Sequence, residues 1–147
     1  VEVNYPKEYY SHIKYITEDY IAVCATSHQF IKEPHTIHDL ISEHLLVREE
    51  GSGTRNILEQ SLIAHGLHIS NFTHYTQIEN MHTIMNLLKK DCGISFLYKI
   101  AVEKELQSKE LKKITLDDFK LQHDFDIIWE KESIYADKYL SISKEFI

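Results

Sequence analysis

Apolar residues along this chain occur in two patterns, as short continuous runs and at helical spacing. Continuous runs are typical of strands that a sheet buries on both faces, whereas positions three or four apart give a helix one buried face. The runs predict strands over residues 19–26, 45–48, 94–98 and 125–129, while alternating or shorter apolar patterns predict strands over 1–3, 72–78 and 111–116. The spaced positions predict helices over 36–43, 55–65, 81–92, 100–105 and 135–147. Residues 7–17 show no clear period, and we expect them to form a connector.

Strands and helices therefore alternate through most of the chain. That order predicts α/β layers with helices on both faces of a sheet. Both ends have too few neighbours in the chain to bury their apolar residues, so we expect a segment outside this sequence to cover them. The chain opens on Val1 within strand-like sequence, which favours a piece of a longer polypeptide.

Composition is that of a soluble globular domain. The 147 residues suit about one domain, and 43% apolar with 27% charged residues is too apolar for a disordered chain. Sixteen basic against 23 acidic residues give a net charge of −7, which argues against a nucleic-acid surface. The longest apolar run, 94–102, is broken by Ser95 and Lys99 and is too short to cross a membrane. We expect no targeting segment at the start of the chain.

A glycine-rich segment with the sequence Arg-Glu-Glu-Gly-Ser-Gly-Thr-Arg is the most specific local feature. It follows a predicted strand and opens a predicted helix, where free backbone N–H groups and the helix dipole favour an anion. Gly51 and Gly53 let the backbone approach a ligand closely. Ser52 and Thr54 add hydroxyl donors, and Arg55 adds a forked cation. The spacing matches neither a Walker phosphate loop nor a dinucleotide fingerprint, and an ordinary capped turn is the alternative.

A second predicted strand-to-helix junction contains Gln77, Ile78, Glu79 and Asn80. Ligands in open α/β sheets bind beyond the carboxyl ends of the strands, so this helix start would direct further N–H donors toward the same site. The alternative is that Asn80 only caps the helix.

Ten histidines raise the question of a metal site. His35 and His38 are three residues apart, as are His65 and His68, but neither pair has a third ligand at motif spacing. We therefore expect no metal and no cofactor.

The two cysteines, Cys24 and Cys92, do not make a disulfide framework. Their apolar or helix-end contexts predict buried free thiols, as is usual in a reducing compartment. A catalytic pair of Cys92 with His74 or His82 is the alternative.

Several segments resemble the LysR-type transcriptional regulators. The matching segments are 16–23, Ser27-His28, 36–40, 45–55, 84–95 and 126–129 with the helix that follows. The resemblance covers essentially the whole chain and is most specific at the glycine-rich segment. Tyr98 stands where the family often has Pro. Asp91 stands where the family often has Gly, which is tolerable because Asp visits left-handed backbone conformations more readily than most residues.

The resemblance implies a fold like that of the type 2 periplasmic binding proteins. One complete lobe, a mixed sheet flanked by helices, would span residues 19–122. Residues 1–18 would end the other lobe and cross over, and 123–147 would supply its return strand and C-terminal helix. The first part of that lobe and the N-terminal helix-turn-helix would lie outside this chain, which would account for its acidic charge.

The resemblance also implies a ligand-sensing role without catalysis. In the family an effector binds between the lobes and shifts the arrangement of an oligomer. We therefore expect a cytoplasmic regulator that binds a small anion or carboxylate and contacts DNA only through the absent domain, with no membrane involved. By position, the effector contacts would be Gly51, Ser52, Gly53, Thr54, Arg55, Gln77, Ile78, Glu79, Asn80, Leu97 and Tyr98. A homodimer or tetramer is expected, with the helix from Arg55 to His65 in its contact.

Two other functions stay open on the sequence alone. A free-standing solute-binding protein of the same fold would carry a signal peptide or lipid anchor upstream in place of DNA-binding helices. An enzyme would need a reactive Cys92 beside a histidine, or a histidine-bound metal.

Overall fold

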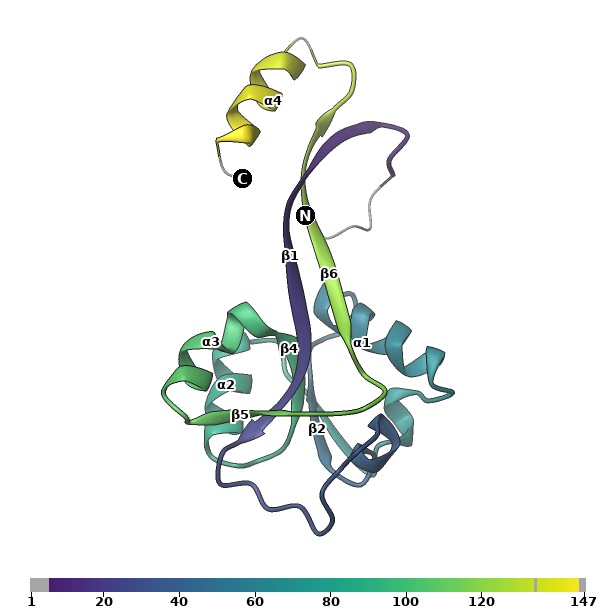
Figure 1. The fold of residues 1–147 in the computed structure, drawn as a ribbon. Helices are drawn as coiled ribbons and strands as arrows, with labels where there is room; N and C mark the ends of the chain where they lie inside the picture. The colour runs from purple at the N-terminus through teal and green to yellow at the C-terminus, as the bar shows by residue number, and fades with distance from the viewer. Residues whose placement is uncertain (1–5, 134, 146–147) are drawn as a thin grey trace. The chain divides into compact units, whose positions relative to one another are not determined.

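The computed structural model describes residues 6–133 and 135–145, and the chain divides into two compact units (Figure 1). Unit 1 comprises residues 1–19 and 122–147, and unit 2 comprises residues 20–121. The long strand β1 (Tyr10–Ala25) contributes its first ten residues, up to Asp19, to unit 1 and its inner half, from Tyr20, to unit 2. The strand predicted over residues 1–3 lies outside the described residues. In the described part of the chain no helix is both long and apolar enough to cross a lipid bilayer.

Unit 2 is a mixed sheet with helices on both faces, as the sequence predicts. Besides the inner half of β1, its elements are η1 (Ile37–Leu40), β2 (His44–Val47), α1 (Gly53–Ala64), η2 (Ile69–Asn71), β3 (His74–Gln77), α2 (Met81–Lys89), β4 (Ser95–Tyr98), α3 (Lys99–Gln107) and β5 (Leu111–Ile114). The inner half of β1 pairs antiparallel with β4 on one side and with β5 on the other. β2 pairs parallel with β3, and a bridge between Leu45 and Ile94 joins β2 to the start of β4.

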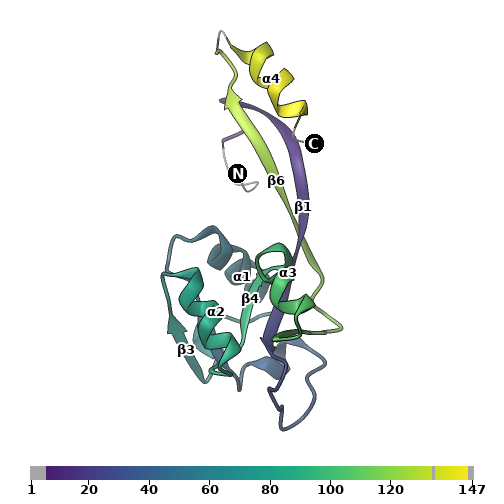
Figure 2. The same cartoon turned by 90° about the vertical axis from the view of Figure 1, so that its left-hand side faces the viewer.

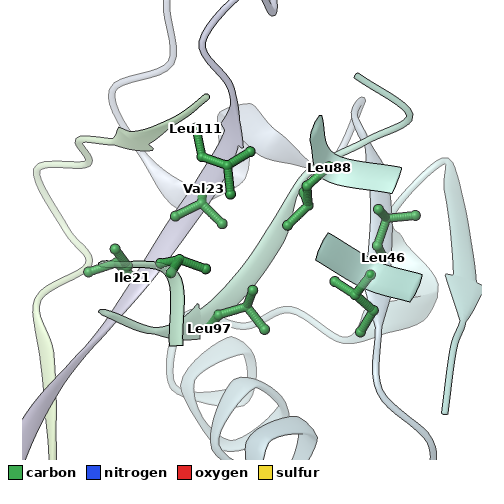
Figure 3. Packing of buried hydrophobic residues seen from close by; sticks show 8 residues of the cluster. Ile21, Val23, Leu46, Leu88, Leu97 and Leu111 are labelled. Carbon is green, nitrogen blue, oxygen red and sulfur yellow. The ribbon is translucent and has the colours of Figure 1, made fainter. Parts of the chain in front are cut away.

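The inner half of β1 is the centre of unit 2. No residue from Tyr20 to Ala25 is more than 4% exposed, which explains why this run lacks a polar face. α2 and α3 cover one side of the sheet and α1 covers the other (Figures 1 and 2). On the α2 and α3 side the core cluster consists of Ile21, Val23, Leu46, Ile84, Leu88, Leu97, Val102 and Leu111 (Figure 3).

The residues that the sequence predicts to begin and end helices do so in the structure. Gly66 follows α1 with a φ of 73°, in the left-handed region that ends many helices. The Asn80 side chain accepts hydrogen bonds from the N–H groups of His82 at 2.8 Å and Thr83 at 3.3 Å, so the predicted cap is confirmed. Asp91 has a φ of 58°, which confirms that it adopts the left-handed conformation expected of it.

Gly93 lies where the backbones of β2 and of the start of β4 approach closely. The N–H of the following residue, Ile94, donates to the His44 oxygen at 2.8 Å, and the Leu46 N–H donates to the Ile94 oxygen at 2.8 Å. A Cβ on Gly93 would stand 2.5 Å from the His44 oxygen and 3.2 Å from a Leu46 side-chain carbon. The junction of β2 with β4 therefore requires a residue without a side chain.

Unit 1 consists of the first part of β1, its partner β6 (Leu121–Glu130) and α4 (Ala136–Lys144). Asp124 links the two strands, because it accepts a hydrogen bond from the Thr17 hydroxyl at 2.6 Å and forms an ion pair with Lys14 at 3.1 Å. Among the described residues of unit 1, only Asp126 and Ser143 are fully buried, and no apolar side chain is. A cavity of about 470 Å³ opens between β6 and α4. The covering segment expected from the sequence stays a prediction.

Three sequence expectations are wrong. Residues 7–17 are not a connector, because β1 begins at Tyr10. The helix predicted over 36–43 is the single turn η1, because only Ile37 and Leu40 are buried there and nothing extends its apolar face. Cys92 is not a buried thiol but an exposed one beyond α2, whereas Cys24 is buried as expected.

Replacing Gly93 with alanine tests the close approach of β2 and β4. We expect the Gly93→Ala variant to lose about 1–3 kcal/mol of unfolding free energy, because the new methyl group overlaps a backbone oxygen that cannot rotate away. Urea unfolding followed by circular dichroism measures the loss. The control is Gly66→Asn, which keeps a residue that tolerates positive φ in open space and should cost less than about 1 kcal/mol. Equal losses for the two variants would contradict the packing account.

Candidate functional site

The glycine-rich segment forms a turn that opens directly into α1. Gly51 takes a φ of 89°, and Ser52 is extended with a φ of −66° and a ψ of 134°, so helical backbone begins at Gly53. The Ser52 side chain makes no capping hydrogen bond. No acceptor among the described residues receives the N–H groups of Gly53, Thr54 or Arg55. The start of α1 therefore offers three backbone donors, and the dipole of α1 adds partial positive charge.

Arg55 does not extend freely toward a ligand, because its guanidinium is bound within the protein. Its side chain is 9% exposed. Nε donates to Glu59 Oε1 at 2.7 Å, while Nη1 donates to the Arg48 carbonyl at 3.1 Å and to Gln77 Oε1 at 3.0 Å. Arg55 thus ties α1 to the ends of β2 and β3.

Carboxylates offset the positive charge around the loop. The Arg48 guanidinium donates two hydrogen bonds to Glu49, at 3.1 and 3.0 Å, and these bonds lower the pKa of that carboxyl group. Glu50 is 85% exposed on its side chain and lies 3.7 Å from Nη2 of Arg55. With Glu59 included, three carboxylates face two arginines. The attraction of this site for an anion therefore depends on backbone N–H groups and hydroxyls more than on free cations.

At the second strand-to-helix junction, residues 77–80, several hydrogen-bond donors are already bound within the protein. Asn80 takes up two of the helix N–H groups of α2, so those donors do not point at a ligand. Ile78 packs against the core cluster, and its N–H donates to the Val47 oxygen at 2.8 Å. Glu79 is exposed. Gln77 is joined to the glycine-rich segment, because its side-chain oxygen accepts a hydrogen bond from Arg55 at 3.0 Å.

The last two residues of β4, Leu97 and Tyr98, are buried. Leu97 is 1% exposed and belongs to the core cluster, and Tyr98 is 8% exposed. The Tyr98 ring packs edge-on against Tyr20 with centroids 5.4 Å apart, and the Tyr20 hydroxyl donates to the Thr54 oxygen at 2.9 Å. A cavity of about 10 Å³, the size of one water molecule, is lined by Thr54, Arg55 and Leu97 among others.

The sequence did not point to two residues that support this site, Tyr20 and Glu59. Tyr20 stands in the sequence as one member of an apolar run, yet a fully buried tyrosine normally needs a partner for its hydroxyl. Glu59 lies four residues after Arg55 on α1, a spacing that favours an ion pair and that sequence alone displays.

The arrangement of cysteines and histidines gives no support to catalysis. Burial raises the pKa of the Cys24 thiol to about 12, which keeps it unreactive. The contact found for the Cys92 sulfur is the Lys90 carbonyl oxygen at 3.8 Å, not a histidine. Within the described ranges, no three His, Cys, Asp or Glu side chains are grouped so that they could hold a metal ion.

The α/β fold of unit 2 and its glycine-rich helix start agree with the effector-binding domain that the sequence resembles. Residues 6–135 match the family model described as the LysR substrate binding domain, so the chain belongs to that family. The HTH-type transcriptional regulator CbbR of Rhodospirillum rubrum is 28% identical over 109 residues, which are 74% of this chain and 35% of that protein. The chain spans about a third of the length of the curated relatives it matches first. These relatives are regulators and not enzymes.

Solved structures agree on the fold. The regulatory domain of CcmR from Synechocystis PCC6803, in complex with 2-PG, matches with a TM-score of 0.79 at 18% identity, over 99% of this chain and 70% of that one. The bromide-bound regulatory domain of HypT from Salmonella typhimurium matches with a TM-score of 0.66 at 17% identity, over 92% of this chain and 64% of that one. At these identities the comparison establishes the type 2 periplasmic-binding-protein-like fold alone.

Replacing Arg55 tests its role in joining the two junctions. We expect Arg55→Ala to lower the unfolding free energy by about 1–3 kcal/mol, because three partly buried hydrogen bonds of its guanidinium are lost. Arg55→Lys should recover little of this, since an ammonium group lacks the planar fork. A double-mutant cycle with Gln77→Ala, measured by urea unfolding, should give a coupling of about 0.5–3 kcal/mol. Strict additivity would show that Arg55 and Gln77 do not support each other.

Proposed function

We propose that this chain is the ligand-sensing part of a LysR-type transcriptional regulator and that its effector is a small anion or carboxylate. The observation that carries the proposal is the start of α1, where three N–H groups lack acceptors in the described structure and two hydroxyls stand beside them. Such a helix start is an anion site that needs no free cation. The bromide bound by HypT and the 2-PG bound by CcmR are consistent with effectors of this class.

In this proposal the eleven sequence-predicted residues take different parts. Gly51, Ser52, Gly53 and Thr54 supply the backbone approach, the N–H donors and the hydroxyls. Arg55 and Gln77 hold the two junctions together, and Arg55 also contributes its N–H. Ile78, Glu79, Asn80, Leu97 and Tyr98 shape the walls. The effector would bind between two lobes, residues 19–122 and a second lobe that includes residues 1–18 and 123–147.

The rest of the regulator would convert binding into control of transcription. A ligand shifts an equilibrium only by its difference in affinity between two states, so closing the lobes on the effector would favour one oligomer geometry. DNA would be bound by an N-terminal helix-turn-helix outside this chain, in the cytoplasm. The net charge of −7 suits a domain that does not itself touch DNA.

A homodimer contact involving α1 is part of the proposal. Ile63 on α1 is 52% exposed and Tyr75 on the neighbouring strand β3 is 50% exposed. Together with Ile69 and other residues they line a pocket of about 290 Å³. All four residues of β3 are exposed, and in the described chain its only strand partner is β2. An apolar helix face beside a strand edge suits contact with a second copy.

Removing a single N–H group tests the anion site. Gly53 is the first helical residue and Ser52 is already extended, so Gly53→Pro fits the backbone and deletes one donor. We expect the affinity for the anion that binds best among bromide, phosphate and acetate to fall at least about tenfold, since a hydrogen bond to a charged group contributes about 1.5–3 kcal/mol. Isothermal titration calorimetry and thermal shift measure it.

The matched control for this test is Gly53→Ala, which keeps the N–H and should keep the affinity. The proline variant should remain as stable as the wild type, because proline at this position restricts the unfolded chain. Stabilisation by phosphate that is the same in all three proteins is a general salt effect. Specific binding that survives Gly53→Pro unchanged would contradict the proposed site.

A charge on the exposed face of α1 tests the oligomer contact. Ile63→Glu should raise the dimer dissociation constant at least about tenfold, because an unpaired carboxylate in an apolar contact costs more than about 1.4 kcal/mol. Sedimentation velocity over a concentration series measures the change. Ile31→Glu is the control, since Ile31 is fully exposed in a loop and should have no effect. Equal dissociation constants for the wild type and Ile63→Glu would exclude α1 from the contact.

A further inference from the structure

His65 lies at the C-terminal end of α1, with both ring nitrogens against backbone carbonyl oxygens. Nδ1 is 2.8 Å from the Ser61 oxygen, one turn earlier in the same helix, and Nε2 is 2.8 Å from the Asp118 oxygen. A carbonyl oxygen only accepts hydrogen bonds, so both bonds form only when both ring nitrogens carry a proton. The side chain is 26% exposed, so protons from solvent reach it.

We infer that His65 is a proton-operated staple that ties the C-terminal end of α1 to the loop before β6. The protonated ring donates to both carbonyl groups. The neutral ring keeps one proton and presents a lone pair to the other oxygen, so one of the two bonds is replaced by repulsion. Losing either bond releases the ring from the position that joins Ser61 to Asp118, two residues far apart in the sequence.

The surroundings of the ring favour its protonated form. The pKa of His65 is raised, first by the hydrogen bond to the Ser61 carbonyl and further by the carbonyl and the carboxylate of Asp118, while partial burial opposes the shift. The Asp118 carboxylate lies 3.9 Å from Nε2 and is the one charged group that faces the ring among the described residues. The C-terminal end of the α1 dipole also favours a cation.

His65 holds the segment that contains Asp118 and Phe119, and this segment is linked to both ends of α1. The Asp118 carboxylate accepts a hydrogen bond from the Ile37 N–H at 3.0 Å, which fixes the residue that His65 holds. The next residue, Phe119, packs its ring 6.3 Å from that of Tyr20, whose hydroxyl donates to Thr54 at the start of α1. Protonation of His65 therefore strengthens the contacts that hold α1 in place, and no effector needs to be bound for this.

The pH dependence of unfolding tests the staple. Because the folded-state pKa is raised, the stabilisation is fully present below the unfolded value of about 6.5 and is lost as pH rises through the folded value. We expect the thermal midpoint of the full chain to fall more steeply with pH above about 6.5 than that of His65→Gln, whose amide does not titrate. His38→Gln, which replaces an exposed histidine outside this contact, is the control, and the slope of His65→Gln should be the shallower of the two.

A second measurement needs no variant to fold. Nitrogen-15 chemical shifts of the histidine rings report whether both nitrogens carry a proton. At about pH 6.5, where an unperturbed histidine is half neutral, the His65 ring should be mostly doubly protonated. A His65 ring that is mostly neutral at this pH, or a His65→Gln slope equal to that of the wild type, would overturn the inference.

Discussion

The burial of one six-residue strand segment, Tyr20–Ala25, is the constraint on which unit 2 depends. This segment hydrogen-bonds to β4 on one side and β5 on the other, and helices cover both of its faces. Its side chains therefore have to be apolar on both faces, and the two faces must meet different helices. Tyr20 is the exception that has a polar atom, and its hydroxyl is used to hold the first turn of α1. The packing of the core and the placement of the candidate site thus depend on the same strand.

The candidate site shows how charge and hydrogen-bonding capacity differ in what they offer a ligand. Two arginines flank the glycine-rich segment, yet both are occupied by carboxylates and by backbone or side-chain carbonyl groups. Their contribution is to fix the geometry of the turn. The donors left without acceptors in the described structure are backbone N–H groups at a helix start, whose positions side-chain motion does not change. A site of this kind selects for negative charge while the surface around it stays close to neutral.

Local sequence signals predicted the elements of unit 2 well, and non-local contacts explain the failures. The apolar run of inner β1, the Asn80 cap and the Gly66 helix end each depend on a few neighbouring residues. The first half of β1 was missed because its partner β6 lies more than a hundred residues away, as the hydrogen bond between Thr17 and Asp124 shows. Local propensity does not display a pairing of that kind.

The same distinction holds at the candidate site. The glycine-rich segment was visible as a motif, and its place at a helix start follows from hydrophobic periodicity. The partners of Arg55 were not visible, because Gln77 and the Arg48 carbonyl come to it only when β2 and β3 pair. A sequence shows which groups carry charge, but folding decides which of those charges remain available to a ligand.

The difference in burial between the two units has a consequence for how the chain opens in solution. Unit 2 contains every fully buried apolar side chain found in the described residues, while unit 1 buries only Asp126 and Ser143 to that degree. Amide hydrogens in inner β1, β4 and β5 are therefore exchanged for deuterium only through openings that approach global unfolding. Those of outer β1, β6 and α4 have far less apolar burial to oppose a partial opening. We therefore expect unit 1 to open at a lower free energy than unit 2.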